Sequence, residues 1–591
     1  MTDTPSATVP HYDVVLLGGG LAGLTLARHL LLATDKSILL VERREELPTD
    51  RQKVGESTVQ LAGYYLSRVL DLEEYLLRRH FMKYNLRFYW PSGQRDNDVF
   101  EDYGQGFIRN FSNVASYQLD RNEIERELLE RNLASERFTA VLGARSAQVE
   151  INPEGPHRLS FRQGGEDHTV ETDWFVDTTG RQRLLARELD NKRDNPIRHG
   201  SFFWWVDGTI DLDKLTDLDR DAIRKKPQRR LQGHLPTWLA TNHFCAEGLW
   251  FWVIPLQGKT SLGIVYDPEC LPHDEVFSVE KATDWVCREF PLFARDLPHR
   301  EVLDFGGYRD FSYDCEQTLS AQRWAVAGEA GRFSDPLYSP GSDLISIYNT
   351  LIVDAIRTDD PGELATKARS YEQLMQATYS AYEPSYARSY DALGDQETFS
   401  LKYTWELAVY FAFYVFPFLN DLFTERRFLP SYFKAFGRLG PINSGLHKLL
   451  SDYFQWKRAH LPPQAEPVLF DFASIEPLAR AEKTFYEVGV SIEEARSVLS
   501  AQLENLEELA LFITARIAAV VIGEPQAIHH AGFVGRLDPR ETTFDPEGFR
   551  QLWREAGESV GNYPWTFDVA VASAFDVESS DRTVATEREA G

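Results

Sequence analysis

Three glycines near the start of the chain have the spacing of a phosphate-binding loop. Gly18, Gly20 and Gly23 form a G-x-G-x-x-G pattern that directly follows a short apolar run, residues 11–17. In such a loop the first glycine permits a tight turn, the second lets the backbone approach a pyrophosphate, and the third lets a helix pack on the strand. The N–H groups and positive dipole end of that helix then face the anion. The pattern predicts a dinucleotide site.

The elements that must position this loop follow in order. Residues 21–33 carry apolar side chains at helical spacing, and residues 37–41 form a second apolar run that ends at Glu42. This order is that of a βαβ dinucleotide-binding unit. Glu42 lies about 20 residues beyond the loop, where an acidic side chain accepts hydrogen bonds from an adenosine ribose.

Two further patterns lie later in the chain. Residues 250–255 read W-x-W-x-I-P, and residues 333–341 read F-x-x-P-x-x-S-x-G. Alternate residues of a strand share one face, so Trp250 and Trp252 should lie side by side. Indoles placed in this way fill a core more often than they take part in chemistry, and a structural turn alone also explains residues 340–341.

Composition limits the classes of function. The chain has 591 residues, 43% of them hydrophobic, and a formal net charge of -27. Such a length predicts two or more domains, and the charge disfavours binding to a nucleic-acid backbone. The one dense basic run, residues 224–230, fits a solvated surface, a docking patch for a partner, or a patch that steers substrate.

The sequence favours a reducing cytoplasm and predicts no metal site. The four cysteines show no C-x-x-C pairing, and the adjacent His529 and His530 have no third ligand nearby in sequence. The first apolar run is too short for a signal peptide, and the aromatic run at residues 408–419 is interrupted by Pro417 and too short to cross a bilayer. We expect no membrane insertion. The cysteines are Cys245, Cys270, Cys287 and Cys315.

The expected fold class is α/β, with a Rossmann-like dinucleotide-binding domain, a β-sheet substrate region and a mainly helical C-terminal region. We expect the core at residues 1–350, with sheet segments at about residues 85–120 and 195–320, helices at 351–579 and a polar tail at 580–591. Aromatic and β-branched runs predict strands, and apolar spacing predicts helices. The runs are residues 86–90, 201–206, 249–254 and 261–265 for strands, and 497–510 and 513–521 for helices.

Taken together, residues 11 to about 350 resemble the FADH2-dependent, two-component halogenases built on the flavin monooxygenase fold. W-x-W-x-I-P and F-x-x-P-x-x-S-x-G are patterns of that family. Residues 177–181 resemble its D-x-x-G-R segment, and residues 328–330 resemble its G-D-A segment with Glu in place of Asp. The resemblance implies that FAD is held by Gly18, Gly20, Gly23, Glu42, Lys53, Arg121, Asp177, Gly328 and Glu329.

The same resemblance implies that Lys83 is the catalytic residue. Residues 54–58 match a V-G-E-S/A-T turn, and residues 81–85 match the surroundings of the family's lysine. In the family, reduced flavin and O2 give a hydroperoxide that chloride or bromide attacks, and the lysine holds the hypohalous acid or forms a haloamine. Burial would lower the pKa of the lysine and assist either role. Lys53 is the competing lysine, although its position fits flavin contact better.

The family also implies a halide site and a wall between flavin and substrate. Ser339 and Gly341 match the turn whose N–H groups bind the halide. The resemblance implies that this wall is formed by Trp250, Trp252, Ile254, Pro255 and Tyr338.

Tyr338 stands where tryptophan halogenases have a catalytic glutamate. The chain is therefore nearer to the phenol, pyrrole and chloramphenicol-pathway types. The implied substrate is a phenol, a pyrrole or an activated acyl group, free or on an acyl carrier protein, and the implied partner is a separate NAD(P)H-flavin reductase.

Two other functions are compatible with the sequence. A single-component FAD-dependent monooxygenase shares the fold, and a fold does not fix a reaction. A non-catalytic flavoprotein that acts as an adaptor in a pathway is the second alternative, suggested by the large C-terminal region and the basic run.

Overall fold

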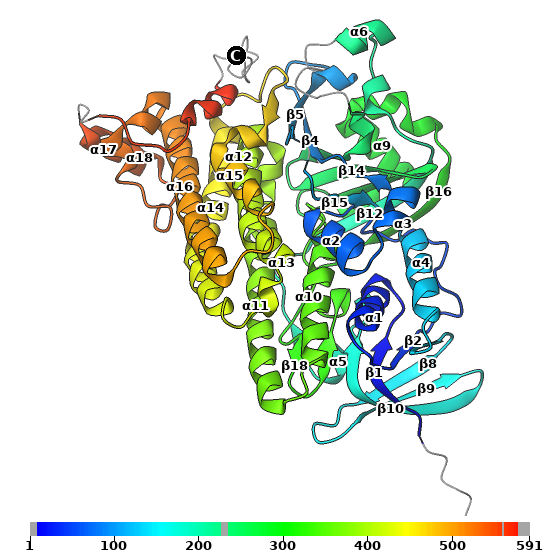
Figure 1. Ribbon diagram of the computed structural model, residues 1–591. Helices are drawn as coiled ribbons and strands as arrows, with labels where there is room; N and C mark the ends of the chain where they lie inside the picture. The colour runs from blue at the N-terminus through cyan, green and yellow to red at the C-terminus, as the bar shows by residue number, and fades with distance from the viewer. Residues whose placement is uncertain (1–8, 111, 226–234, 558–560, 577–591) are drawn as a thin grey trace, which may run out of the picture. The chain divides into compact units, whose positions relative to one another are not determined.

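The computed structural model describes residues 9–110, 112–225, 235–557 and 561–576 (Figure 1). The chain divides into two compact units, each built from three separate segments. Part of the basic run, residues 226–230, and the expected tail at residues 580–591 lie outside the described residues. The domain bounds that we expect near residues 350 and 579 stay predictions. Unit 1 comprises Met1–His80, Leu119–Ile197 and Phe311–Ser380, and unit 2 comprises Phe81–Gln118, Arg198–Asp310 and Ala381–Gly591.

Unit 1 is built on a parallel sheet. The sequence-predicted first strand and helix are confirmed with the expected bounds, β1 at His11–Leu17 and α1 at Leu21–Ala33. Helix α1 packs against α4 and α10, which flank it in Figure 1. The parallel strands run in the order β19 (Trp324–Val326), β10 (Glu166–Asp177), β1, β2 (Ile38–Val41) and β7 (Phe138–Val141), and the two helices are α4 (Arg121–Leu133) and α10 (Pro340–Ile356).

An antiparallel extension completes the core of unit 1. Strands β8 (Arg145–Glu150) and β9 (His157–Gln163) pair with each other, and β9 pairs with the first half of β10. Alternate residues of β1, such as Val15 and Leu17, lie in one apolar cluster with Phe161 of β9. Because side chains alternate along β1, one face of the parallel sheet is buried against this extension. Helix α1 also contacts β1.

Unit 2 contains an eight-stranded mixed sheet. Most neighbours are antiparallel, whereas β13 pairs with β4 and β20 pairs with β5 in parallel. The predicted strands at residues 86–90, 201–206, 249–254 and 261–265 are confirmed as parts of this sheet. Its order is β16 (Val302–Tyr308), β12 (Gly200–Asp207), β15 (Lys259–Tyr266), β14 (Leu249–Leu256), β13 (Thr241–Ala246), β4 (Leu86–Pro91), β5 (Tyr103–Phe107) and β20 (Leu469–Asp471).

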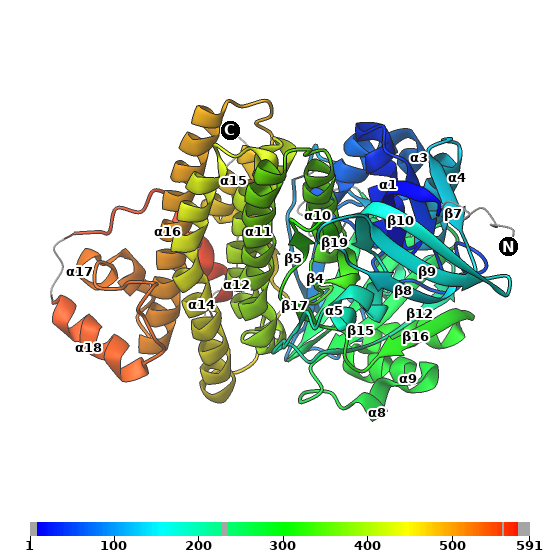
Figure 2. The ribbon, with the colours of Figure 1, turned by 90° about the horizontal axis from the view of Figure 1, so that it is seen from below.

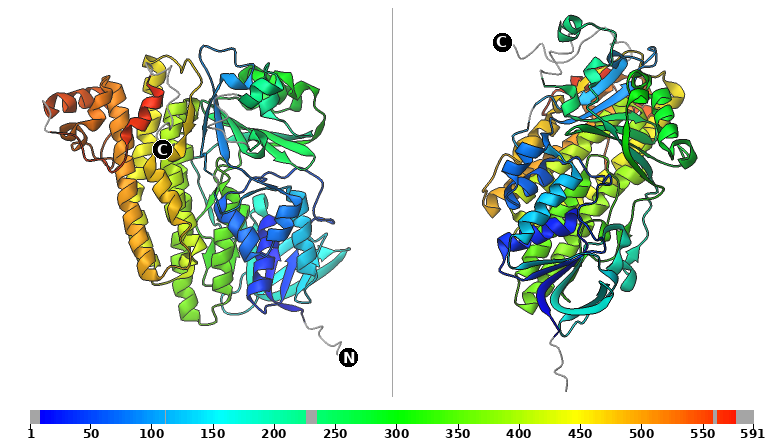
Figure 3. Two further views of the ribbon diagram at one scale, coloured as in Figure 1. Left: turned by 45° about the horizontal axis from the view of Figure 1, so that its top comes forward. Right: turned by 90° about the vertical axis from the view of Figure 1, so that its right-hand side faces the viewer.

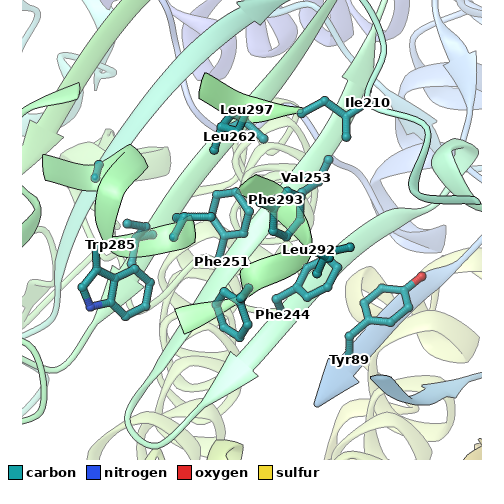
Figure 4. Close-up of a cluster of buried hydrophobic side chains, with 14 of the residues drawn as sticks. Tyr89, Ile210, Phe244, Phe251, Val253, Leu262, Trp285, Leu292, Phe293 and Leu297 are labelled. Atoms are coloured by element: carbon teal, nitrogen blue, oxygen red, sulfur yellow. The ribbon is translucent and has the colours of Figure 1, made fainter. Parts of the chain in front are cut away.

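The two faces of this sheet bury different side chains. Phe244, Phe251 and Val253 lie in a large apolar cluster with Trp285 of α9 (Val279–Glu289), as Figure 4 shows. Successive residues of a strand point to opposite faces. Trp250 and Trp252, which alternate with Phe251 and Val253 along β14, therefore lie on the other face of the sheet.

The C-terminal part of unit 2 is helical, as the sequence predicts. The two helical patterns at residues 497–510 and 513–521 form one continuous helix, α16 (Ile492–Ile522). Helix α16 packs with α12 (Gln396–Tyr410) and α14 (Leu429–His460), and Figures 2 and 3 show the three running side by side.

A buried ion cluster joins these three helices. The Glu397 carboxylate accepts hydrogen bonds from Arg516 at 2.9 and 2.7 Å and from Lys457 at 2.8 Å. Burial alone would raise the pKa of Glu397, but the charges of Lys457 and Arg516 outweigh it and lower the pKa to about 2. Glu397 is thus ionised in the interior, where it links α12, α14 and α16.

The remaining helices and strands include one long helix, α11, and several short elements. The helices are α2 (Gln60–Tyr64), α3 (Glu73–Arg79), α5 (Leu184–Glu188), α6 (Arg220–Lys225), α8 (His273–Val276), α11 (Pro361–Ala387), α13 (Phe416–Leu419), α15 (Glu476–Thr484), α17 (Ala531–Val534) and α18 (Pro546–Ala556), and the strands are β3 (Phe81–Met82), β6 (Tyr117–Gln118), β11 (Lys192–Arg193), β17 (Asp314–Cys315) and β18 (Leu319–Ser320). Within the described parts of the chain, no helix combines the length and apolar character needed to cross a bilayer.

Candidate cofactor and active site

The glycine loop of unit 1 leaves room for a ligand at one position only. A Cβ atom on Gly18, which has a φ of +121°, would lie 2.3 Å from the Thr178 carbonyl oxygen, and one on Gly23 would lie 2.2 Å from the Gly18 carbonyl oxygen. A Cβ atom on Gly20 would meet no described atom within 4 Å. Helix α1 begins after Gly20 without a side-chain cap or an acidic residue in its first turn. The loop therefore presents uncapped N–H groups to open space, which fits a pyrophosphate.

Glu42 lies at the end of β2 and contacts the same loop. Its Oε2 accepts the Gly19 N–H at 2.7 Å, and its Oε1 accepts the Arg44 N–H at 2.9 Å. A carboxylate has about four lone-pair sites, so both oxygens keep acceptor capacity for ribose hydroxyls. The geometry fits the expected ribose contact and adds a second role, since Glu42 also fixes the glycine loop.

Asp177 holds the turn that follows β10. Its Oδ1 accepts the Thr179 N–H at 2.9 Å and its Oδ2 accepts the Leu185 N–H at 2.7 Å, and the side chain is fully buried. Burial raises the pKa of Asp177, although these hydrogen bonds oppose the shift. The carboxylate thus positions the turn, and a direct contact with a cofactor stays a prediction.

Gly328 and Glu329 lie in a turn after β19. Gly328 has a φ of +58°, and a Cβ atom there would lie 2.9 Å from the Cβ of Ala22, so this turn packs against the first residues of α1. The Glu329 carboxylate accepts the Tyr313 hydroxyl at 3.2 Å. The structure thus places this segment beside the glycine loop, as a common cofactor site requires.

A buried carboxylate brings two of the predicted cofactor residues together. Glu125 accepts hydrogen bonds from Arg121 at 2.7 Å and from Lys53 at 2.5 Å, and its side chain is only 2% exposed. Arg121 also donates to the Val54 carbonyl oxygen at 2.7 Å. Burial lowers the pKa of Lys53, and the charge of Glu125 opposes this shift. Glu125 was not among the residues predicted from the sequence, although its spacing of four from Arg121 on a predicted helix was a usable signal.

The turn with the expected halide residues has an unusual backbone. Tyr338 and Ser339 both have positive φ, 68° and 63°, and the Ser339 N–H donates to the Pro336 carbonyl oxygen at 2.9 Å. Helix α10 begins at Pro340, which has no N–H, and Gly341 is its second residue. N–H groups in the first turn of a helix have no intrahelical acceptor. An anion here would therefore bind at Gly341 and beyond, and the halide role of Ser339 stays a prediction.

Lys83 lies in unit 2, on the segment between β3 and β4. It is only 4% exposed, and its backbone N–H donates to the Ser116 carbonyl oxygen at 2.8 Å. The nearby His243 is fully buried, which lowers its pKa to about 3, and the charge of Lys83 contributes to the shift. His243 is therefore neutral at physiological pH. Its Nδ1 faces the Arg87 carbonyl oxygen at 3.1 Å.

The two tryptophans of β14 lie beside this histidine. The ring centres of Trp250 and Trp252 are 5.7 Å apart, and that of His243 lies 5.3 Å from Trp250. Both indoles are buried, and so are Ile254 and Pro255. In unit 2 the structure thus brings together Lys83, His243 and the W-x-W strand. His243 was not predicted from the sequence, because its place depends on which strands pair.

Several similar proteins are halogenases by name. No protein-family model matches the chain. A flavin-dependent halogenase, chlA of Dictyostelium discoideum, is 28% identical over 393 residues, which are 62% of this chain and 63% of that protein. A 1H-pyrrole-2-carbonyl peptidyl-carrier-protein chlorinase of Pseudomonas fluorescens is 24% identical over 375 residues, 59% of this chain and 77% of that protein. The tetracycline 7-halogenase of Kitasatospora aureofaciens is 26% identical over 398 residues, 61% of this chain and 67% of that protein.

The chain is a relative of flavin-dependent halogenases. It spans 63% of the length of the Dictyostelium protein. Among solved structures, halogenase PltM matches with a TM-score of 0.57 and 16% identity, covering 84% of this chain and 96% of that one. The chondrochloren halogenase CndH matches with a TM-score of 0.50 and 19% identity, covering 64% and 81%. These likenesses confirm the predicted fold class.

Proposed function

We propose that the protein is an FAD-dependent halogenase that uses reduced FAD, O2 and chloride or bromide to halogenate an electron-rich small molecule. Its similarity to flavin-dependent halogenases along about 60% of its length supports the proposal. The observation that carries it is the burial of Lys83 close to His243, whose ring lies against Trp250. Buried ionisable groups that perturb one another are concentrated at functional sites.

Unit 1 would hold the FAD. The N-terminus of α1 and the open space at Gly20 accept the pyrophosphate, Glu42 accepts the ribose hydroxyls, and Lys53 and Arg121 add positive charge. Bound reduced FAD would supply the electrons that activate O2. The segment at Gly328 completes the cradle beside the glycine loop. A separate flavin reductase would supply the reduced cofactor.

Lys83 would hold the oxidised halogen. Its ammonium can donate a hydrogen bond to hypohalous acid and polarise it. After loss of one proton, the neutral amine can instead attack the halogen of hypohalous acid, so that an N–halogen bond forms, the O–halogen bond breaks, and the hydroxide leaves as water with a second proton from Nζ. Trp250 and Trp252 would form a wall that keeps water out and directs the small oxidant. Gly341 and the following N–H groups of α10 would hold the halide.

The substrate that we propose is a phenol, a pyrrole or an activated acyl group. Tyr338 takes the place of an acidic residue, so the substrate must activate its own ring, as an ionised phenol does. Among the similar proteins, PltM has been solved with phloroglucinol and FAD, and the Pseudomonas relative acts on a pyrrole bound to a carrier protein. The substrate would be free or carried in the same way. We propose a cytoplasmic location.

The test is a reaction of purified protein with chemically reduced FAD, O2 and bromide. Phenols, pyrroles and their carrier-bound forms are offered, and products are read by mass spectrometry. The Lys83→Ala variant should bind FAD normally but lose at least about 100-fold of the halogenated product. The matched control is Lys259→Ala, which removes a lysine of the same unit that lies over Trp205.

The outcomes separate the alternatives. A bromine isotope pattern that vanishes only in the Lys83→Ala variant supports the proposal. Full halogenation by this variant would remove Lys83 from the mechanism. An oxygenated product without bromine, formed with NAD(P)H alone, would favour a single-component monooxygenase.

A further inference from the structure

A short segment before α12 accepts two buried indole N–H groups from one sheet. We name residues 390–394, which comprise Tyr390 and the 3₁₀ turn at Asp391–Gly394, the clasp. The Trp250 Nε1 donates to the Tyr390 hydroxyl oxygen at 2.7 Å, and the Trp90 Nε1 donates to the Leu393 carbonyl oxygen at 2.8 Å. Both indoles belong to strands of the unit 2 sheet, β14 and β4.

The clasp is fixed from several sides. The ring of Tyr390 stacks on that of His199 with centres 3.9 Å apart, and both residues are buried. A Cβ atom on Gly394 would lie 3.0 Å from backbone atoms of Glu247, so glycine lets the clasp pack closely against the turn before β14.

The other side of the clasp is attached to α14. The Asp391 Oδ2 accepts hydrogen bonds from the Ser451 hydroxyl and the Gln455 side-chain amide, each at 2.8 Å. The clasp therefore links the helical part of unit 2 to the strand that carries Trp250.

The two tryptophans of W-x-W are anchored differently. The Trp252 Nε1 donates to the Ser261 hydroxyl at 3.2 Å, a partner on the neighbouring strand β15. Trp250 instead depends on Tyr390, which lies 140 residues away in sequence. A buried indole N–H that loses its acceptor costs the desolvation of that group, so the ring would turn toward another partner. The orientation of Trp250 is thus set by the clasp and not by the sheet alone.

We infer that Tyr390 is a positioning residue for the proposed halogenation, which acts by holding Trp250 in place in the active-site wall. The inference rests on the proposed function. It assigns a role at the site to the helical part of unit 2. If Trp250 turns, a gap opens next to His243 and Trp252, and the oxidant can escape before it reaches the substrate.

The test compares Tyr390→Phe, Trp250→Phe and the double variant with the wild type. The main measurement is the halogenated product formed per reduced FAD consumed, together with the release of hydrogen peroxide. Each single variant should bind FAD normally and lower this yield about 5- to 10-fold, as expected for one lost hydrogen bond to a buried donor. The kcat for product should fall while the substrate KM stays nearly constant. Tyr266→Phe is the matched control, because it removes a buried-ring tyrosine hydroxyl that contacts His273 at 2.8 Å.

The double variant decides whether the two residues act as one unit. If Tyr390 acts through Trp250, the product yield of the double variant is no lower than that of the more impaired single variant. A yield that falls by the product of the two single effects would overturn the inference, and so would a wild-type yield in Tyr390→Phe.

The product formed by the wild type separates this inference from the proposed function. If the wild type halogenates none of the substrates offered, the proposed function fails. If it halogenates and Tyr390→Phe matches it, only the inference fails. Urea unfolding of the same four proteins should show non-additive effects of the two substitutions. Additive effects would show that Tyr390 does not act through Trp250.

Discussion

A methyl group at Gly20 tests whether the glycine loop binds a pyrophosphate without disturbing the fold. Its Cβ would meet no described atom within 4 Å, and Gly20 has a φ of -85°, which alanine adopts without strain. Gly20→Ala lowers the conformational entropy of the unfolded chain, which raises the free energy of unfolding by about 0.4–1 kcal/mol. Alanine is worse than glycine at a helix N-cap by a similar amount, roughly 0.5–1 kcal/mol. The free energy of unfolding should therefore change by less than about 0.5 kcal/mol.

The affinity for FAD should fall instead. The methyl group would occupy the open space in front of α1, where the pyrophosphate must approach the backbone. We expect a loss of at least about tenfold in FAD affinity, or about 1.4 kcal/mol. The measurement is a fluorescence titration of FAD with purified protein, alongside thermal unfolding of the same sample.

Gly23→Ala provides the contrast. Its Cβ would lie 2.2 Å from the Gly18 carbonyl oxygen and 2.8 Å from the Thr178 hydroxyl, so strand and helix would have to move apart. Overpacking of this kind costs about 1–3 kcal/mol, and both the Tm and the FAD affinity should decrease. Normal FAD binding by Gly20→Ala would refute the reasoning, because the pyrophosphate would then lie elsewhere.

Three further predictions concern buried groups. Glu125→Gln leaves two cations without a counter-charge and should lower the free energy of unfolding, measured in urea, by about 3 kcal/mol. The control Glu127→Gln, at a more exposed carboxylate, should lower it by less than about 1 kcal/mol. Because the pKa of Glu397 is lowered from 4.5 to about 2 in the folded protein, its stabilising effect is complete above pH 4.5 and is lost as the pH falls toward 2. The wild type should lose about 3 kcal/mol over this window, and Glu397→Gln should show a flatter pH dependence in denaturation at stepwise pH. In Gly263→Ala the new Cβ would lie 2.2 Å from the Trp252 indole, so halogenated product should decrease while FAD affinity is kept.

The sequence predicted the parts of the fold that local patterns determine. The strand, the glycine loop and the helix at residues 11–33 follow from apolar periodicity and three glycines, and the structure gives the same bounds. The strand around Trp250 was predicted for the same reason. Periodicity acts over a few residues, so these elements needed no knowledge of the tertiary structure.

What the sequence did not show depends on contacts between distant segments. His243 comes near Lys83 because β13 pairs in parallel with β4, and no short-range signal specifies that pairing. Tyr390 meets Trp250 only through the packing of a connecting turn on the sheet.

The interleaving of the two units has a consequence during synthesis on the ribosome. The last segment of unit 1 ends at Ser380, so this unit can fold while the rest of the chain is still being translated. In unit 2, the outer edge of β5 pairs Gln105 with Leu469, a partner made 364 residues later (469 - 105). At a synthesis rate of about 5–20 residues per second, the edge of β5 stays unpaired for about 20–70 s. A nascent chain therefore exposes an unpaired strand edge for tens of seconds, and chaperones that cover such edges should affect the yield of unit 2 more than that of unit 1.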